Sequence, residues 1–362
     1  MKISLVTFHC AISHGATLQT LALCRFLEEA GQAVEIVDYR PDAIAQPPDW
    51  RRTRLRGWHP AHLESWTLRR RFAAFWARHY AMSARSYRTF AELQADPPEA
   101  DVYVCGSDQI WNPAITGGAF DPAYFLDFAP AGRRRIAYAP SFGGPNLPPE
   151  HRDPLRRLLA GFHAVSCREP SGAAFLAAET GRTVPAVLDP TFLWNGYETI
   201  LPADAPTDID DYLFAYPLQH DAEFTQAAAA GGAELGVPLR TANGPWKFWT
   251  QPGRPVYPDP GRWAALVRHA RAVVTHSFHG VAFSILFRKN FVVLPLAGAT
   301  AARNARIVEL LDRMGLADRL VPAADLPAVR RQLKTPIDWD AVGRLQAQHR
   351  ENSARFLLDA LR

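Results

Sequence analysis

Two things that the sequence lacks, abundant cysteine and long apolar runs, limit the class of protein. Cysteine occurs only four times in 362 residues. The four are too widely spaced for a compact zinc motif, and a long cytosolic chain needs no disulfide framework. We therefore expect each cysteine to be buried and to pack as a small apolar side chain. No run is apolar enough to span a bilayer, and the short apolar start predicts a strand rather than a signal peptide. The expected location is therefore the cytoplasm.

Net charge is also small, at a formal +4, which does not by itself indicate a nucleic-acid partner. The charge is uneven, however, because residues 50–90 hold ten arginines and a single acid, Glu64, interleaved with aromatic residues. Basic and aromatic residues together are typical of surfaces that bind nucleic acid, an anionic membrane or an acidic glycan. The alternative is a helical excursion whose aromatic side chains pack inward and whose arginines are solvated.

The opening residues have the pattern of an α/β protein. Residues 2–8 predict a strand, residues 17–30 an amphipathic helix that ends at Gly31, and residues 33–39 a second strand. Such a βαβ unit implies a parallel, doubly wound sheet, with the loop at 9–16 on its ligand-binding edge. That loop lacks the GxGxxG pattern, so nothing supports a dinucleotide site.

The length of 362 residues favours two domains. Strand–helix alternation continues on both sides of residues 202–211, which have the Pro- and Asp-rich composition of a linker. We therefore expect two Rossmann-like lobes, residues 1–203 with the helical excursion at 50–90 and residues 204–362 with a long final helix. The cleft between two such lobes is the default ligand site. Further short strands are expected at 124–128 and 319–321.

One turn combines two histidines with a helix start. Residues 271–275 are β-branched and predict a buried strand, and an apolar helix follows Gly280. Free N–H groups and the helix dipole make such a turn an anion site, where Gly280 would let the backbone approach a ligand. His276 or His279 could supply a proton near neutral pH. In the alternative interpretation, Ser277 is only the helix N-cap and one histidine is a core residue.

Several short motifs, taken in order, carry a resemblance to a known family. They are Gly15–Gln19, Val37–Pro41, Gly106–Pro113, Tyr138–Gly143, Arg168–Gly172, Leu188–Thr191, Ser277–Gly280 and Asn304–Arg306. This ordered set, covering about residues 1–325, resembles the polysaccharide pyruvyl transferase family. The first loop departs from the pattern, with Ser13-His14-Gly15 where many relatives carry Asn-Tyr-Gly. This departure bears on the identity of the acceptor more than on the type of reaction.

The resemblance implies a pyruvyl (ketal) transferase. Such an enzyme moves pyruvate from phosphoenolpyruvate onto two hydroxyls of a sugar and releases phosphate. The implied acceptors are cell-envelope or extracellular glycans, as in exopolysaccharide biosynthesis, or their lipid-linked precursors. The implied fold is GT-B-like, with the acceptor on the N-terminal lobe and phosphoenolpyruvate on the C-terminal lobe. No metal and no organic cofactor are expected. The arginine- and tryptophan-rich segment at 50–90 could dock the enzyme on the inner face of the membrane, beside a lipid-linked acceptor.

The chemistry then assigns roles on the donor side. His279 is the expected proton donor to the methylene carbon, and beside a positive helix end it needs an acidic neighbour or the bound phosphate to stay protonated. Arg168 is a candidate clamp for phosphate or carboxylate, with a salt bridge to Glu169 or Asp189 as the alternative. Arg306 is a second candidate clamp, with a place on a surface helix as the alternative.

Other candidates face the acceptor. Asp108 could orient or deprotonate a sugar hydroxyl, or it could cap a short helix at Gln109. Gln109 and Asn112 could bind hydroxyls, and Trp111 could stack on the sugar or pack in the core. His276, Ser277 and Gly280 would shape the anion site, His14 and Gly15 would face the same cleft, and Asn304 belongs to the Asn304–Arg306 motif. Trp246, Lys247, Trp249 and Arg254 resemble an acceptor loop.

Two other functions compete with this interpretation. A glycosyltransferase with a nucleotide-sugar donor would have the same lobes, since a fold does not fix a function. It predicts binding of a nucleoside diphosphate. A non-catalytic glycan- or membrane-binding protein built on residues 50–90 predicts salt-sensitive binding that is indifferent to His279.

Overall fold

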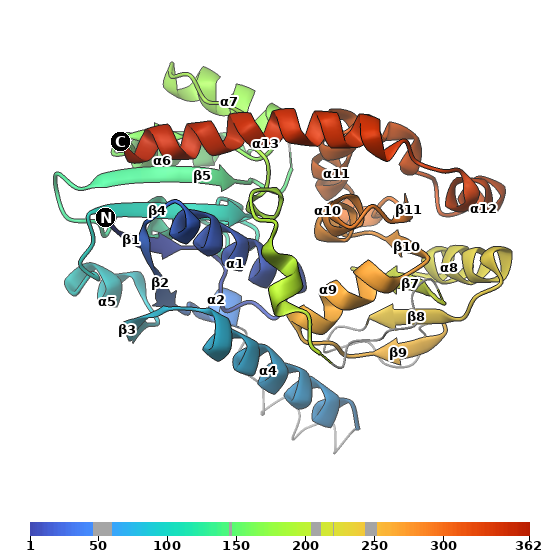
Figure 1. The fold of residues 1–362 in the computed structure, drawn as a ribbon. Helices are drawn as coiled ribbons and strands as arrows, with labels where there is room; N and C mark the ends of the chain where they lie inside the picture. The colour runs from blue at the N-terminus through green and yellow to red at the C-terminus, as the bar shows by residue number, and fades with distance from the viewer. Residues whose placement is uncertain (46–59, 145–146, 204–210, 220, 243–251) are drawn as a thin grey trace. The chain divides into compact units, whose positions relative to one another are not determined.

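The computed structural model describes residues 1–45, 60–144, 147–203, 211–219, 221–242 and 252–362, with side chains from Trp66 onward in the helix that begins at Pro60. The chain forms two compact units, each an α/β structure with one parallel sheet (Figure 1). The first unit comprises Met1–Pro48, Trp76–Asn195 and Gln346–Arg362, and the second comprises Asp49–Phe75 and Gly196–Leu345.

The first unit is built on a six-stranded sheet in the order β3-β2-β1-β4-β5-β6, in which every neighbouring pair is parallel. This is the strand order of a doubly wound Rossmann sheet. Its elements are β1 (Lys2–Val6), α1 (His14–Glu29), β2 (Ala33–Tyr39), α2 (Asp42–Ala45), β3 (Met82–Tyr87), α5 (Phe90–Ala95), β4 (Val102–Asp108), η1 (Pro122–Phe125), β5 (Arg134–Pro140), η2 (Pro149–His151), α6 (Arg152–Leu159), β6 (Ala164–Val165), α7 (Pro170–Thr180) and η3 (Pro190–Phe192).

The second unit has a five-stranded sheet in the order β11-β10-β7-β8-β9, again with every neighbouring pair parallel. Counted from its first strand, β7, this is the same winding as in the first unit. Its elements are η4 (Gly196–Ile200), β7 (Leu213–Tyr216), α8 (Ala222–Leu235), β8 (Leu239–Ala242), β9 (Arg254–Val256), α9 (Pro260–His269), β10 (Ala272–Thr275), α10 (Phe278–Leu286), β11 (Asn290–Val293), η5 (Gly298–Arg303), α11 (Asn304–Arg313), η6 (Ala317–Arg319) and α12 (Leu326–Lys334). The long helices α4 (Pro60–His79) and α13 (Trp339–Leu361) each have residues in both units.

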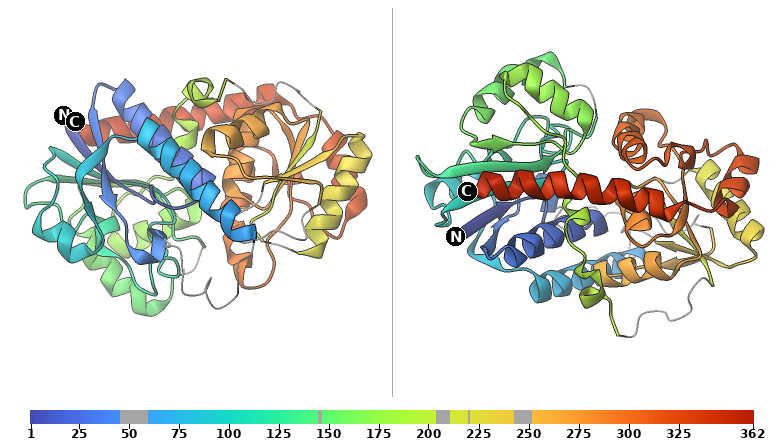
Figure 2. Two further views of the ribbon diagram at one scale, coloured as in Figure 1. Left: turned by 90° about the horizontal axis from the view of Figure 1, so that it is seen from below. Right: turned by 45° about the horizontal axis from the view of Figure 1, so that its top comes forward.

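The units differ from the two lobes expected on either side of residue 203. The structure groups residues 49–75 with the second unit and residues 346–362 with the first. The end of α13 belongs to the first unit because it bonds there, as where Ser353 Oγ accepts the Leu188 N–H at 2.8 Å. The two ends of the chain accordingly lie close together on this unit (Figure 2).

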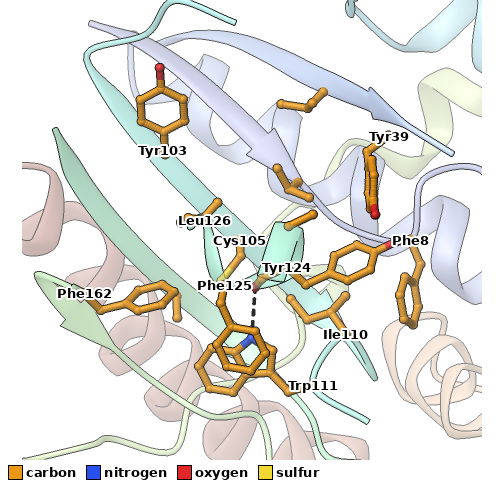
Figure 3. Close-up of a cluster of buried hydrophobic side chains, with 14 of the residues drawn as sticks. Phe8, Tyr39, Tyr103, Cys105, Ile110, Trp111, Tyr124, Phe125, Leu126 and Phe162 are labelled. Carbon is orange, nitrogen blue, oxygen red and sulfur yellow. Dashed lines mark hydrogen bonds between the residues drawn. The ribbon is translucent and has the colours of Figure 1, made fainter. Parts of the chain in front are cut away.

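The core of the first unit contains an aromatic cluster just beyond β4 (Figure 3). Trp111 is fully buried there, and its ring stacks on that of Phe125 with 4.9 Å between the centroids. Its Nε1 donates to the Tyr124 carbonyl oxygen at 3.0 Å. Trp111 is therefore a core residue, as one of the two interpretations held, and not a platform for a sugar.

The prediction of two strands is wrong. Residues 124–128 do not form a strand, because Asp121 caps and Pro122 opens the 3₁₀ helix η1 instead. Of residues 319–321, Arg319 ends the 3₁₀ helix η6 and Leu320 forms an isolated bridge with Val293. The strands β3 and β9 and the helices α5 and α12 were not anticipated, because their apolar residues are few and their spacing is short.

The arginine-rich excursion forms α4, β3 and the start of α5, with residues 50–59 outside the described residues. Phe72, Phe75 and Trp76 of α4 are buried, so these aromatic side chains pack inward. Among the residues that the structure describes, no helix combines the length and apolar character that a membrane crossing requires.

Candidate functional site

Both units place candidate residues where doubly wound sheets bind ligands. Such ligands lie outside the carboxyl ends of the strands, at the point where the strand order reverses. That point falls between β1 and β4 in the first sheet and between β7 and β10 in the second. Asp108 ends β4, and His279 lies in the turn of chain that follows β10. The two residues expected to exchange protons with substrate thus lie at the reversal points of their own sheets.

Thr275, the last residue of β10, fixes the turn that begins α10. Its Oγ1 donates to the Tyr216 carbonyl at 2.8 Å and accepts the Ser277 N–H at 2.9 Å. Ser277 Oγ accepts the Gly280 N–H at 3.3 Å, which makes Ser277 the N-cap of α10. A Cβ on Gly280 would lie 2.4 Å from Thr275 Oγ1. Glycine is therefore required here for the packing of α10 on β10, and the approach of a ligand to its backbone stays a prediction.

The two histidines of this turn have different surroundings. His276 is 1% exposed, its ring centroid lies 4.4 Å from that of Phe224, and its Nε2 lies 4.0 Å from Asp221 Oδ2. His279 is 7% exposed and lies in the first turn of α10, with its ring 5.2 Å from that of Phe278. His279 is therefore the histidine placed among the first N–H groups of the helix, where the dipole favours an anion.

Arg306 brings a buried positive charge to the same helix start. It is 5% exposed, and its Cζ lies 6.0 Å from the ring centroid of Phe278, the residue before His279. The alternative of a solvated surface arginine is therefore wrong. Asn304 is different: its amide oxygen accepts the Leu296 N–H and its amide nitrogen donates to the Leu296 carbonyl, both at 2.8 Å. Asn304 thus holds the backbone that follows β11.

In the first unit, the backbone of Asp108 has an unusual conformation, with φ at 72°. Ala139, on the neighbouring strand β5, has φ at 56°. Asp108 Oδ1 accepts the Gln109 N–H at 2.8 Å, and the Asp108 carbonyl accepts the Ser141 N–H at 2.9 Å. No helix is described at Gln109, so Asp108 does not cap one. Left-handed non-glycine residues on two adjacent strands are typical of functional sites, where the surrounding structure holds the strain.

The side-chain amides of Gln109 and Asn112 form a pair that packs directly on the backbone of Gly143. Gln109 Oε1 accepts a hydrogen bond from Asn112 Nδ2 at 3.0 Å. A Cβ on Gly143, whose φ is 80°, would lie 2.2 Å from Gln109 Oε1 and 2.3 Å from Asn112 Nδ2. The pair therefore depends on glycine at this position. Asn112 Oδ1 also accepts the Ala114 N–H at 3.1 Å. Both amides have hydrogen-bonding capacity beyond these bonds, as binding of sugar hydroxyls requires.

His14 and Gly15 lie at the start of α1 rather than in a loop. Ser13 Oγ accepts the Ala16 N–H at 3.4 Å, so the helix begins three residues earlier than residue 17, where we expected it. His14 is buried, and it follows β1 at the reversal point of the sheet. His14 therefore lies at the ligand-binding edge of the sheet, as expected, but in a helix rather than in a loop.

Arg168 is buried in ion pairs. Its Nε lies 2.8 Å from Glu169 Oε1 and its Nη1 lies 3.1 Å from Asp189 Oδ2. Burial alone would lower the pKa of Arg168, but the charges of Glu169, Asp189 and Asp108 raise it above its usual value. The salt bridges that we considered as the alternative are thus present.

Sequence reasoning missed a polar chain that runs from Asp189 along the carboxyl edge of the first sheet. Ser107 Oγ donates to Asp189 Oδ2 at 2.9 Å, and Thr7 Oγ1 donates to the Ser107 carbonyl at 3.0 Å. His9 continues the chain, with Nδ1 at 3.3 Å from the Thr7 carbonyl and Nε2 at 3.0 Å from Asp38 Oδ1. All of these residues are buried.

The chain ends in a charged group. Arg40 Nε lies 2.6 Å from Asp38 Oδ1, the same carboxylate oxygen that His9 contacts. Burial alone would raise the pKa of Asp38, but the hydrogen bonds from His9 and Arg40 lower it to about 2. A usable signal existed: Asp38 is a charge near the end of an apolar strand, and a histidine follows the neighbouring parallel strand. Trp246, Lys247 and Trp249 lie outside the described residues, and Arg254 opens β9.

Comparison with solved structures defines the class of fold. A glycosyltransferase of kitacinnamycin matches 99% of this chain and 98% of its own, with a TM-score of 0.52 and 13% sequence identity. AviGT4, a glycosyltransferase involved in avilamycin A biosynthesis, matches 100% of this chain and 97% of its own, with a TM-score of 0.50 and 14% identity. The protein therefore has the GT-B-like fold of two Rossmann-like units, which leaves its reaction open.

The family is more specific than the fold. The sequence model of the family described as polysaccharide pyruvyl transferase matches residues 14–296. The chain therefore belongs to the polysaccharide pyruvyl transferase family, and it is a transferase. A search of the curated proteins found no match.

Proposed function

We propose that the protein transfers pyruvate from phosphoenolpyruvate onto two hydroxyls of a saccharide, forms a cyclic ketal and releases phosphate. The observation that carries the proposal is the place of His279 and Asp108 at the reversal points of the two sheets of a pyruvyl transferase family member. The acceptor is a glycan of the cell envelope or outside the cell, or its lipid-linked precursor. The reaction takes place in the cytoplasm and uses no metal or organic cofactor.

The reaction requires one proton donor and one base. His279 gives a proton to the methylene carbon of phosphoenolpyruvate, which leaves positive charge at C2. A sugar hydroxyl attacks C2 and Asp108 accepts its proton. Loss of phosphate then restores the positive charge at C2. The second hydroxyl attacks C2 and closes the ketal, and its proton passes to the released phosphate. The proposed roles of Asp108 as the base for the acceptor and of His279 as the acid for the donor fit this sequence of steps.

The donor binds in the second unit. The first N–H groups of α10 and the guanidinium of Arg306 supply the positive field that phosphate and carboxylate need. Ser277 and Gly280 fix the helix start, and His276 packs behind it. Asn304 acts through the Leu296 backbone.

The acceptor binds in the first unit. The amides of Gln109 and Asn112 bind sugar hydroxyls, and His14 and Gly15 line the same edge. Arg168 positions the residues of this edge rather than clamping an anion, because two carboxylates already neutralise it. A third anion would have to displace one of them.

The test is incubation with phosphoenolpyruvate and a panel of β-galactosides and N-acetylmannosaminides. Phosphate release and acid-labile pyruvate on the sugar are measured, with His279→Gln and Asp108→Asn alongside. Ketal formation that both substitutions abolish supports the proposal. Thermal stabilisation by a nucleoside diphosphate, with none by phosphoenolpyruvate, would overturn it in favour of a glycosyltransferase.

A further inference from the structure

The described side chains of helix α4 gather an aromatic ring and positive charges on one face of the helix, with no acid among them. Its described side chains, from Trp66 to His79, include no aspartate or glutamate. Trp66 is 54% exposed, the highest value among the large apolar side chains that are exposed in the described part of the chain. The exposed residues recur at helical spacing as one stripe, formed by Trp66, Arg70, Ala73, Ala74 and Ala77. Arg71 and Arg78 are also exposed and lie along one side of it.

The arginines of this helix carry uncompensated charge. The Cζ of Arg70 lies 4.6 Å from the ring centroid of Trp66, so the two side chains stack in the open. Within the described residues, no carboxylate lies within 4.0 Å of the guanidinium groups of Arg69, Arg70, Arg71 and Arg78. Exposed arginines elsewhere, such as Arg156 and Arg355, pair with acids of their own helices.

We propose that this face of α4, defined by Trp66, Arg70 and Arg78, docks the protein on an anionic phospholipid surface. Tryptophan favours the boundary between lipid and water, because its ring is apolar and its indole N–H is polar. Anionic headgroups attract the arginines. The alanines leave the stripe low enough for headgroups to approach the helix backbone, while the opposite face, with Leu68, is buried.

A lipid surface fits this face better than a nucleic acid does. Single-stranded nucleic acid binds through several exposed rings on which successive bases stack. The described part of α4 exposes one ring, Trp66, and buries the others at positions 72, 75 and 76. The docking needs no substrate, and only its benefit, access to a lipid-linked acceptor, rests on the proposed function.

The experiment is sedimentation of the full-length protein with vesicles, one set of phosphatidylcholine alone and one with phosphatidylglycerol added. We expect binding only to the anionic vesicles, weakening as salt rises. Arg70→Glu/Arg78→Glu is expected to lower the affinity at least tenfold, since each arginine near such a surface contributes about fivefold. Trp66→Ala is expected to lower it severalfold and to abolish the part that survives high salt.

The matched control is Arg88→Glu/Arg157→Glu, which changes two exposed arginines outside α4. Both double variants lower the formal net charge from +4 by four, to zero. Unchanged affinity in the control supports the proposal, whereas an equal loss in both variants would mean that only net charge matters and would overturn it. Binding to an acidic polysaccharide but not to anionic vesicles would overturn it as well. Turnover with a soluble acceptor, measured separately, reports on the pyruvyl transfer alone.

Discussion

Nε2 of His9 lies 3.0 Å from Oδ1 of Asp38, although 29 positions separate the two residues in the chain. The other ring nitrogen of His9 lies 3.3 Å from the Thr7 carbonyl, which can only accept a hydrogen bond. Because one ring nitrogen faces the Thr7 backbone and the other faces the Asp38 carboxylate, His9 links the chain after β1 to β2 inside the edge of the sheet that carries Asp108.

The first prediction concerns Asp38→Asn. The pKa of Asp38 in the folded protein, about 2, lies below the value of about 4 expected in the unfolded chain. Its charged form therefore stabilises the fold above about pH 4, and this contribution is lost as the pH falls toward 2. We expect the substitution to lower the free energy of unfolding at pH 7 by about 1 kcal/mol, because solvent partly screens the group.

The measurement is urea unfolding of both proteins at pH 7 and pH 3. The gap between them should shrink at pH 3. A gap of the same size at both values would mean that shape, not charge, matters. His9→Gln, alone and combined with Asp38→Asn, should show coupling between the two sites.

The second prediction concerns Gly143→Ala. The added Cβ would meet both Gln109 Oε1 and Asn112 Nδ2, at 2.2 and 2.3 Å. We expect the amide pair to separate and the KM for the acceptor to rise about tenfold or more, while the KM for phosphoenolpyruvate changes little. Gly132→Ala is the matched control, because Gly132 also has φ at 80° but nothing within 4 Å of its Cβ. Both variants carry the backbone strain, so an equal rise in KM would count against the amide pair as the acceptor site.

Much of the fold was predictable from the sequence, since β-branched runs and capped amphipathic helices specify their own conformations. Ser277 before α10 and Asp221 before α8 are such caps. The fate of Arg168 was not predictable in the same way. Its partner Asp189 is 21 positions away and reaches it only because Cys167 pairs with Ala186 beside β6. The sequence therefore left the salt bridge and the clamp as alternatives.

Motifs likewise did not determine the role of every residue that they contain. Gly280 fits any tight helix start, and only the packed structure shows that Thr275 fills the space of its missing Cβ. Trp111 follows Asp108 closely, but it turns into the core, where its ring meets Phe125. Periodicity predicts which helices and strands form. Contacts between these elements decide whether a motif residue packs in the core or faces a ligand.

The third prediction separates the two arginines. Arg168→Gln leaves two buried carboxylates without their cation, so we expect a loss of about 3 kcal/mol or more in the free energy of unfolding. The KM for phosphoenolpyruvate should change little in the folded protein. Arg306→Gln removes a donor of charged hydrogen bonds at the start of α10, so we expect that KM to rise about tenfold to a hundredfold.

The two variants are compared by chemical unfolding and by initial rates with soluble acceptor. An Arg168→Gln protein that is stable but has lost affinity for phosphoenolpyruvate would show that Arg168 is the clamp after all. Loss of activity in Arg168→Gln without a stability measurement decides nothing, because unfolding alone would produce it.

The last prediction tests how Thr275 positions His279. Thr275→Val keeps the shape of the side chain but removes the hydroxyl that bridges the Tyr216 carbonyl and the Ser277 N–H. We expect a loss of about 1–3 kcal/mol in stability, because the buried Ser277 N–H loses the Thr275 hydroxyl and the Tyr216 carbonyl keeps only the long bond from the His276 N–H, at 3.4 Å. We also expect kcat to fall about tenfold or more, since the start of α10 carries the proton donor and is no longer fixed. Thr275→Ser restores the hydroxyl and should recover most of kcat, with little change in the KM for the acceptor. A Thr275→Val enzyme that keeps its kcat while losing stability would show that the hydroxyl supports the fold alone, and that His279 is held by the N-cap bond of Ser277 without it.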